Sequence, residues 1–313
     1  MNNTEYFSKQ LLADVVWENF GIKSQADFNQ NYITIGKFHK NVPEVIQNDF
    51  KIVESLQFFS YYKYAIIDEA FGKATRIFEA SIDLKINSLG IEKKGFEPLS
   101  SKIRRLEIYS SSELHKQWVH SKEIRNLFAH HKAGRLMGVT LIRGFKHIVN
   151  MINSVFLEKH EIIEKENLLK IIAKESVHLK KGLFIMEYNR NKYLVWSMQP
   201  YTALLKDGLE QSFWVFHPVF GVNKIESVSD FPEPFKLNLK NLKITNDGLS
   251  ATVIETKETI NITKTDKIEN IAKYEFHLKQ MRDLNLDLEH DYTLILQSDI
   301  NKAITNFIYL YAW

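Results

Sequence analysis

The spacing of apolar residues predicts a helical first half of the chain. Up to about residue 160, apolar side chains recur every three or four positions, as they do along one face of an α-helix. Pro43 breaks an ambiguous stretch over residues 24–50. Helices are predicted over residues 4–22, 52–89, 99–109, 110–131 and 135–160. Because short connections join them, these helices predict an up-down helical bundle over residues 1–164.

The periodicity changes after about residue 165. Short runs rich in aromatic and β-branched residues follow, and residues 235–240 alternate between apolar and polar side chains, which is typical of strands. Asn189-Arg190-Asn191 separates two apolar runs and predicts a hairpin, and Asn246-Asp247-Gly248 predicts a second turn. Strands are predicted over residues 183–188, 192–196, 213–222, 235–240 and 251–262. Two helices, over 266–284 and 299–313, are predicted to close the chain. Residues 165–313 therefore predict a mixed domain with an antiparallel β-sheet and terminal helices, and the whole chain predicts an α+β fold in two domains.

Composition narrows the classes of protein to consider. The 313 residues include no cysteine, which excludes disulfides, thiolate metal sites and a cysteine nucleophile. The first residues lack a basic run followed by an apolar core, so no signal peptide is predicted. The longest apolar stretch, residues 136–157, contains Arg143, Lys146 and His147, and it predicts a buried helix rather than a membrane span. We therefore expect a cytoplasmic protein with no membrane partner.

Positive charge is concentrated in one segment. The net charge of the whole chain is only +3, but residues 93–146 hold 12 basic and 4 acidic side chains, and no Asp or Glu occurs between Glu123 and Glu158. This distribution has two interpretations. It favours an anionic partner such as RNA, or it marks a solvated helix surface.

Ten residues within this basic segment, 123–132, carry the candidate chemistry. They contain Arg125, Asn126 directly after it, and His130 five positions after the arginine. An arginine followed by a histidine after four to six residues is expected about 0.8 times by chance in a chain of this composition. The interpretation therefore depends on Asn126, on the order of the helices and on the acid-free stretch around the motif.

With that context, residues 55–160 resemble the HEPN superfamily, whose members carry an Arg, a polar residue and a His at this spacing. Catalytic members are metal-independent ribonucleases, often prokaryotic toxins or defence proteins, and they act as dimers with one cleft between two protomers. The resemblance implies that Arg125, Asn126 and His130 are catalytic, with His131 as an alternative to His130. It also implies RNA, a second copy of the chain and an antitoxin as partners.

The residue types suit this chemistry. A histidine has a pKa near neutrality and can act as the base for an RNA 2′-hydroxyl, a forked guanidinium can bind the charge that grows on the phosphoryl oxygens, and an amide can orient the imidazole. On an ideal helix Arg125 and His130 lie about 140° apart, so we expect a second protomer to complete the site. Structural roles remain open: Arg125 can pair with Glu69 or Glu79, and His130 can stabilise a helix C-terminus.

Further basic residues are candidates for gripping an RNA backbone, although an exposed helix face also explains them. They are Lys102, Arg104, Arg105, His131, Lys132 and Arg135. The histidines do not show the spacing of a metal site, and no phosphate-binding glycine loop occurs, so neither a metal nor a cofactor is expected.

The leading hypothesis is a metal-independent RNA endonuclease of toxin or phage-defence type. One alternative is a non-catalytic module with the same fold that dimerises or binds RNA. Another is a protein that binds a small ligand through its C-terminal domain.

Overall fold

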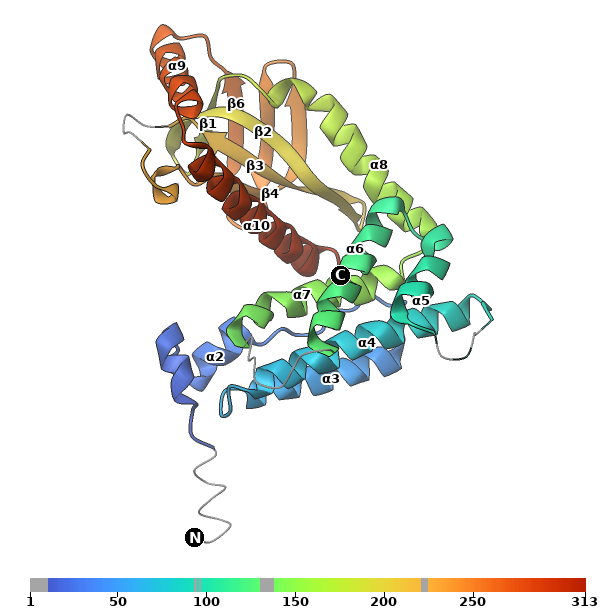
Figure 1. The fold of residues 1–313 in the computed structure, drawn as a ribbon. Helices are drawn as coiled ribbons and strands as arrows, with labels where there is room; N and C mark the ends of the chain where they lie inside the picture. The colour runs from blue at the N-terminus through green and yellow to red at the C-terminus, as the bar shows by residue number, and fades with distance from the viewer. Residues whose placement is uncertain (1–10, 93–94, 96, 130–137, 221–224) are drawn as a thin grey trace. The chain divides into compact units, whose positions relative to one another are not determined.

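A computed structural model describes residues 11–92, 95, 97–129, 138–220 and 225–313, with the backbone alone for 124–129. The chain divides into two compact units, Met1–Ile162 with Trp313, and Ile163–Ala312. Helices predominate in the first unit and an antiparallel sheet in the second (Figure 1). The predicted α+β class is confirmed.

The first unit begins differently from the prediction. In the described part of residues 4–22, the chain forms a 3₁₀ helix, η1 (Val15–Phe20), between the Asp14 cap and Gly21 at φ +73°. The predicted α-helix is therefore wrong there. The reason is that Trp17 alone is buried in η1, with its indole N–H donating to the Ser60 carbonyl (2.8 Å). Several apolar residues of the presumed helix face are exposed instead.

The long helix predicted over 52–89 is two helices. They are α3 (Glu44–Phe59) and α4 (Ile66–Ser88), which lie side by side (Figure 1). Asp14 holds the break between them, because its backbone N–H donates to the Tyr61 carbonyl (2.9 Å) and its carboxylate accepts from the Tyr64 N–H (2.8 Å). These partners come from a distant part of the chain, so local spacing carried no sign of the break.

The remaining helices of this unit include α2 (Gln25–Tyr32), which lies in the stretch over residues 24–50 that the sequence left ambiguous. The others are α5 (Leu99–Arg105), η2 (Glu107–Tyr109), α6 (Ser112–Ala129), η3 (Gly138–Leu141) and α7 (Ile142–Val155). The buried face predicted for residues 135–160 is confirmed at Leu141, Phe145, Ile148, Val149, Ile152 and Phe156. That helix ends at Val155, and α8 (Lys159–Glu175) follows and continues into the second unit. Gly134, the predicted end of the preceding helix, lies outside the described residues.

The sheet of the second unit closes into a six-stranded barrel, which the sequence did not predict. Each strand pairs antiparallel with the next, and β1 also pairs with β6. The strands are β1 (Phe184–Tyr188), β2 (Asn191–Lys206), β3 (Leu209–Pro218), β4 (Phe235–Thr245), β5 (Gly248–Val253) and β6 (Thr259–Lys264). The first predicted hairpin is confirmed, with Asn189 (φ 52°) and Arg190 (φ 60°) at its turn. Their two positive φ angles match a type I′ turn, which suits the twist of the paired strands.

Apolar side chains fill the interior of the barrel, and a helix covers one side of it. Inward residues such as Met186, Trp214 and Leu239 are almost fully buried in one apolar cluster. The helices of this unit are η4 (Val177–Leu179), η5 (Val228–Asp230), α9 (Ile268–Arg282) and α10 (Leu286–Tyr311). Helix α10 starts earlier than predicted and lies across β2, β3 and β4, where Ile300 and Phe307 are buried (Figure 1). Among the described helices, none combines the length and the apolar character needed to cross a bilayer.

Candidate active site at the end of helix α6

The motif identified in the sequence lies near the described end of α6. Arg125 and Asn126 belong to this helix by their backbone, and nothing is described of their side chains. His130, His131, Lys132 and Arg135 lie outside the described residues. The helix starts at Ser112, two residues later than predicted, and the Ser111 hydroxyl caps it by accepting from the Leu114 N–H (3.1 Å).

Two side-chain hydrogen bonds tie α6 to α7. The Trp118 indole N–H donates to Ser154 Oγ (2.8 Å), and Ser121 Oγ lies 2.9 Å from His147 Nε2. The single hydroxyl proton of Ser121 is donated to the Gln117 carbonyl (2.9 Å), so the imidazole Nε2–H must be the donor to Ser121. The contact therefore uses the Nε2–H of His147 as its donor.

The surroundings of His147 keep it neutral. Burial and, to a smaller extent, the nearby His120 together lower the pKa of His147 to about 4. The His120 ring lies 6.4 Å from the His147 ring, and His120 Nδ1 lies 3.7 Å from Glu123 Oε2. At neutral pH the tie between α6 and α7 is thus a hydrogen bond between two uncharged groups.

Helix geometry relates the motif to the start of α7. Along α6, positions 118, 121 and 125 are separated by three and four residues and share one face. Along α7, positions 154, 147 and 143 are separated by seven and four residues and also share a face. The ties join 118 to 154 and 121 to 147, so the two helices run antiparallel. Continuing the same pairing puts the backbone of position 125 beside the first turn of α7, near position 143.

The chain is also fixed where it returns after residue 137. The Gly138 N–H donates to Asp68 Oδ1 (2.9 Å), and the Val139 N–H donates to Tyr64 Oη (2.7 Å). Gly138 has φ +52°, and a Cβ atom there would lie 2.0 Å from Tyr64 Oη. Only glycine fits this close approach. The eight residues 130–137, which include His130, thus run between an anchored helix and an anchored turn.

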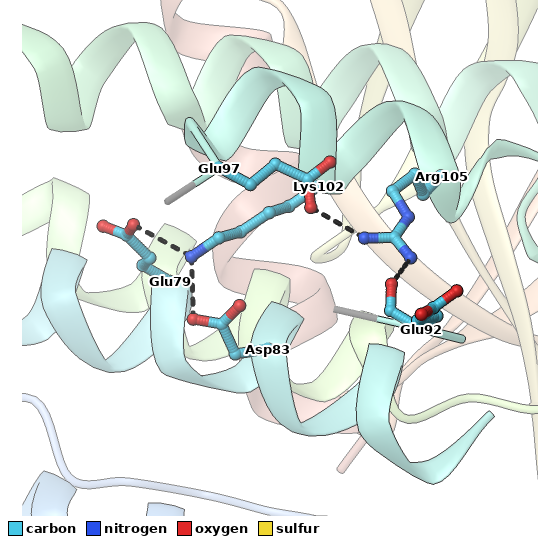
Figure 2. Close-up of polar contacts among 6 residues, drawn as sticks. All are labelled: Glu79, Asp83, Glu92, Glu97, Lys102 and Arg105. Atoms are coloured by element: carbon cyan, nitrogen blue, oxygen red, sulfur yellow. Dashed lines mark hydrogen bonds and ion pairs between the residues drawn. The ribbon is translucent and has the colours of Figure 1, made fainter. Parts of the chain in front are cut away.

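Two of the basic residues on α5 are engaged in ion pairs inside the chain (Figure 2). Lys102 Nζ lies 2.9 Å from Asp83 Oδ2 and 3.5 Å from Glu79 Oε1, both on α4. Carboxylates therefore already compensate the charge of Lys102. Glu79, a candidate partner for Arg125 in the sequence analysis, contacts this lysine.

The second engaged residue is Arg105. Its Nη1 lies 2.7 Å from Glu97 Oε2, and its Nη2 donates to the Glu92 carbonyl. Arg104, between the two engaged residues, is exposed and has no ion-pair partner among the described residues. Of the three basic side chains on α5, Arg104 is thus the one whose charge faces solvent without compensation.

A pocket of about 670 Å³ lies within the first unit, between the η1–α2 segment and the η3–α7 segment. Both polar and apolar side chains line it, among them Phe20, Asp27, Asn31, Tyr32, Ile142 and Arg143. The sequence did not predict this pocket. Its two walls are more than a hundred residues apart in the chain and share no motif, so no local signal pointed to it.

Clusters that could bind a metal were also sought. Within the described ranges, no group of three or more His, Asp or Glu side chains is arranged to hold a metal ion. Comparisons with protein-family models, with curated proteins and with solved structures found no match to this chain.

Proposed function

We propose that the first unit is a HEPN-like helical bundle that cleaves RNA without a metal ion. The observation that carries this proposal is the placement of α6. Its two ties to α7 turn the face that includes position 125 toward the start of α7, so Arg125 and Asn126 belong to a helix with a fixed rotation. The resemblance of the motif and the acid-free stretch from 124 to 157 supply the rest of the support.

The proposed reaction uses the three residues of the motif. His130 takes the proton from an RNA 2′-hydroxyl, and the 2′-oxygen attacks the adjacent phosphorus. The bond from phosphorus to the 5′-oxygen breaks, and a protonated imidazole returns a proton to that leaving oxygen. Arg125 binds the charge that builds up on the phosphoryl oxygens, and Asn126 orients the imidazole or donates to the phosphate. The products carry a 2′,3′-cyclic phosphate and a 5′-hydroxyl.

We further propose that the site is completed in a homodimer. A regular helix puts Arg125 and His130 about 140° apart, so one helix alone does not direct both side chains at the same phosphate. Two copies of α6 meeting at a symmetry axis would bring an arginine of one protomer beside a histidine of the other. In this proposal the protein acts in the cytoplasm as a toxin or phage-defence nuclease, with an antitoxin as a further partner.

Arg104 is the described residue best suited to gripping the RNA backbone. It is exposed and lacks an ion-pair partner in the described part of the chain, whereas Lys102 and Arg105 contact carboxylates. His131, Lys132 and Arg135 stay in the proposal on their sequence position alone.

Cleavage in the presence of EDTA tests this function. Purified wild-type chain, Arg125→Ala and His130→Ala are incubated with RNA, and the ends of the products are identified. His160→Ala and Arg282→Ala are matched controls, because both change exposed residues of the same types in other helices. We expect cleavage with cyclic phosphate ends in the wild type and the controls, and loss of cleavage in the two motif variants. Equal residual activity in all five proteins would mean a contaminating nuclease and would refute the proposal.

The non-catalytic alternative predicts a different result from the same proteins. If the bundle only dimerises or binds RNA, sedimentation would show a dimer and RNA binding would persist, with no cleavage in any sample. The ligand-binding alternative gains no support from the barrel, because its interior is occupied by the apolar cluster around Met186, Trp214 and Leu239.

A further inference from the structure

We propose that the pocket between η1–α2 and the start of α7 binds one nucleotide of the RNA substrate. This inference rests on the proposed function, and it adds a subsite that selects the base near the cleaved phosphate. The pocket volume of about 670 Å³ lies inside the range of roughly 300–1,000 Å³ that is common for small-ligand sites.

Arg143 is the group that would hold a phosphate. Its side chain is exposed at the pocket and has no ion-pair partner among the described residues. It lies in the first turn of the 14-residue helix α7, where the helix dipole favours an anion. It also shares a face with His147, one turn away, so it lies near position 125 of α6. A phosphate at Arg143 would therefore be close to the proposed catalytic arginine.

Aromatic side chains give the pocket rigid walls. The rings of Phe20 and Tyr32 line it, and both contact Trp17, with ring centroids 6.1 Å and 5.1 Å apart respectively. Tyr32 also stacks on Phe28, with 5.6 Å between ring centroids and an interplanar angle of 5°. Because these contacts fix the rings before any ligand arrives, a flat base can pack against them without a cost for ordering them.

Asp27 and Asn31 contribute acceptor atoms to the pocket. Asn31 Nδ2 donates to Asp27 Oδ1 (2.7 Å), and this turns the Asn31 amide so that its carbonyl oxygen is its remaining polar atom. The Asp27 carboxylate has lone pairs beyond those used by Asn31 and by the Lys23 N–H (3.3 Å). Adenine, cytosine and guanine each have an exocyclic amino group with two donor hydrogens, whereas uracil offers only its single N3–H. Several acceptors side by side therefore pair more completely with the first three bases, so we infer a preference against uridine.

Fluorescence anisotropy with labelled RNA octamers tests the subsite. All proteins carry His130→Ala, so that the RNA stays intact. We expect oligo(A) and oligo(C) to bind more tightly than oligo(U). Adding Arg143→Gln should weaken oligo(A) binding about tenfold, the loss of one charged hydrogen bond to phosphate. Adding Asn31→Ala should reduce the preference over oligo(U), because the Asp27 carboxylate remains as the other acceptor. Arg282→Gln, on α9 of the second unit, is the matched control and should leave both unchanged.

The outcomes separate this inference from the proposed function. Unchanged affinity in both pocket variants overturns the subsite, even if the wild-type chain cleaves RNA. Weakened binding in Arg143→Gln supports the subsite, even if the wild-type chain shows no cleavage and the proposed function fails. The binding of free AMP and CMP is measured in the same experiment. If they bind at the pocket while the octamers do not, its ligand is a free nucleotide and the RNA subsite is overturned.

Discussion

His147 makes the tie between α6 and α7 sensitive to acid. An unperturbed histidine has a pKa of about 6.5, whereas burial lowers the pKa of His147 to about 4 in the folded chain. Between these two values the unfolded chain binds a proton that the folded chain does not. Stability that is fully present above pH 6.5 is therefore lost as the pH falls toward 4.

The size of the effect follows from the two pKa values. Between pH 7 and pH 5, the difference in proton binding at His147 removes at most about 2 kcal/mol from the stability of the first unit. His147→Gln provides the comparison, because a glutamine amide can still donate to Ser121 but does not titrate. We expect the variant to lose less stability than the wild type over this range.

Hydrogen exchange of α6 and α7 measures this difference locally, after correction for the effect of pH on intrinsic exchange rates. The local measurement matters because the second unit contains His217 and His277, whose pKa values burial also lowers to about 4. Both proteins retain those two histidines, so their contribution cancels in the comparison. If the wild type and His147→Gln lose the same protection between pH 7 and pH 5, the assigned role of His147 is wrong.

Four further substitutions test other parts of the structure. Gly138→Ala puts a Cβ atom 2.0 Å from the Tyr64 hydroxyl, at a residue whose φ is +52°. We therefore expect urea unfolding to show that the free energy of unfolding of the first unit falls by at least about 2 kcal/mol. An unchanged midpoint would contradict the close approach. Gly248→Ala puts a Cβ atom 1.8 Å from a backbone carbonyl oxygen of β6, so the melting temperature of the barrel should fall by about 5 °C. A calorimetric scan with no shift would contradict the described pairing of β5 with β6. Lys102→Met leaves two carboxylates of α4 uncompensated, so we expect lower stability with little change in RNA affinity. Arg104→Gln should instead lower the RNA affinity with little change in stability. Equal affinity losses in the two variants would show that the ion pairs of α5 open when RNA binds.

Features with a local cause could be predicted from the sequence. The buried face of α7 follows from a period of three to four residues, and the hairpin at Asn189 follows from residues that tolerate positive φ. The split between α3 and α4 could not be predicted, because its cause is Asp14, about fifty residues away. Closure of the barrel depends on the pairing of β1 with β6, which alternation within one strand does not specify.

The charge of the basic segment shows why counting along the chain overestimates a binding surface. The count over residues 93–146 includes Lys102 but leaves out Glu79 and Asp83, since these two belong to the preceding helix. In three dimensions they are the nearest charges to Lys102. For the pocket, counting along the chain instead misses a site. Tyr32 and Arg143 are far apart in the sequence and line the same pocket only in the folded chain.

Residues that take no part in the proposed reaction position the elements that carry the catalytic residues. Trp118 and Ser121 fix the rotation of α6 on α7 and so decide where position 125 lies. Gly138 fixes the far end of the eight residues that include His130. Under the proposed function, weakening either anchor would misplace the catalytic groups while the phosphate contacts at Arg104 stay intact. Substitutions at these anchors should therefore reduce the rate of cleavage much more than the affinity for RNA, since small displacements of reacting groups cost far more in rate than in binding.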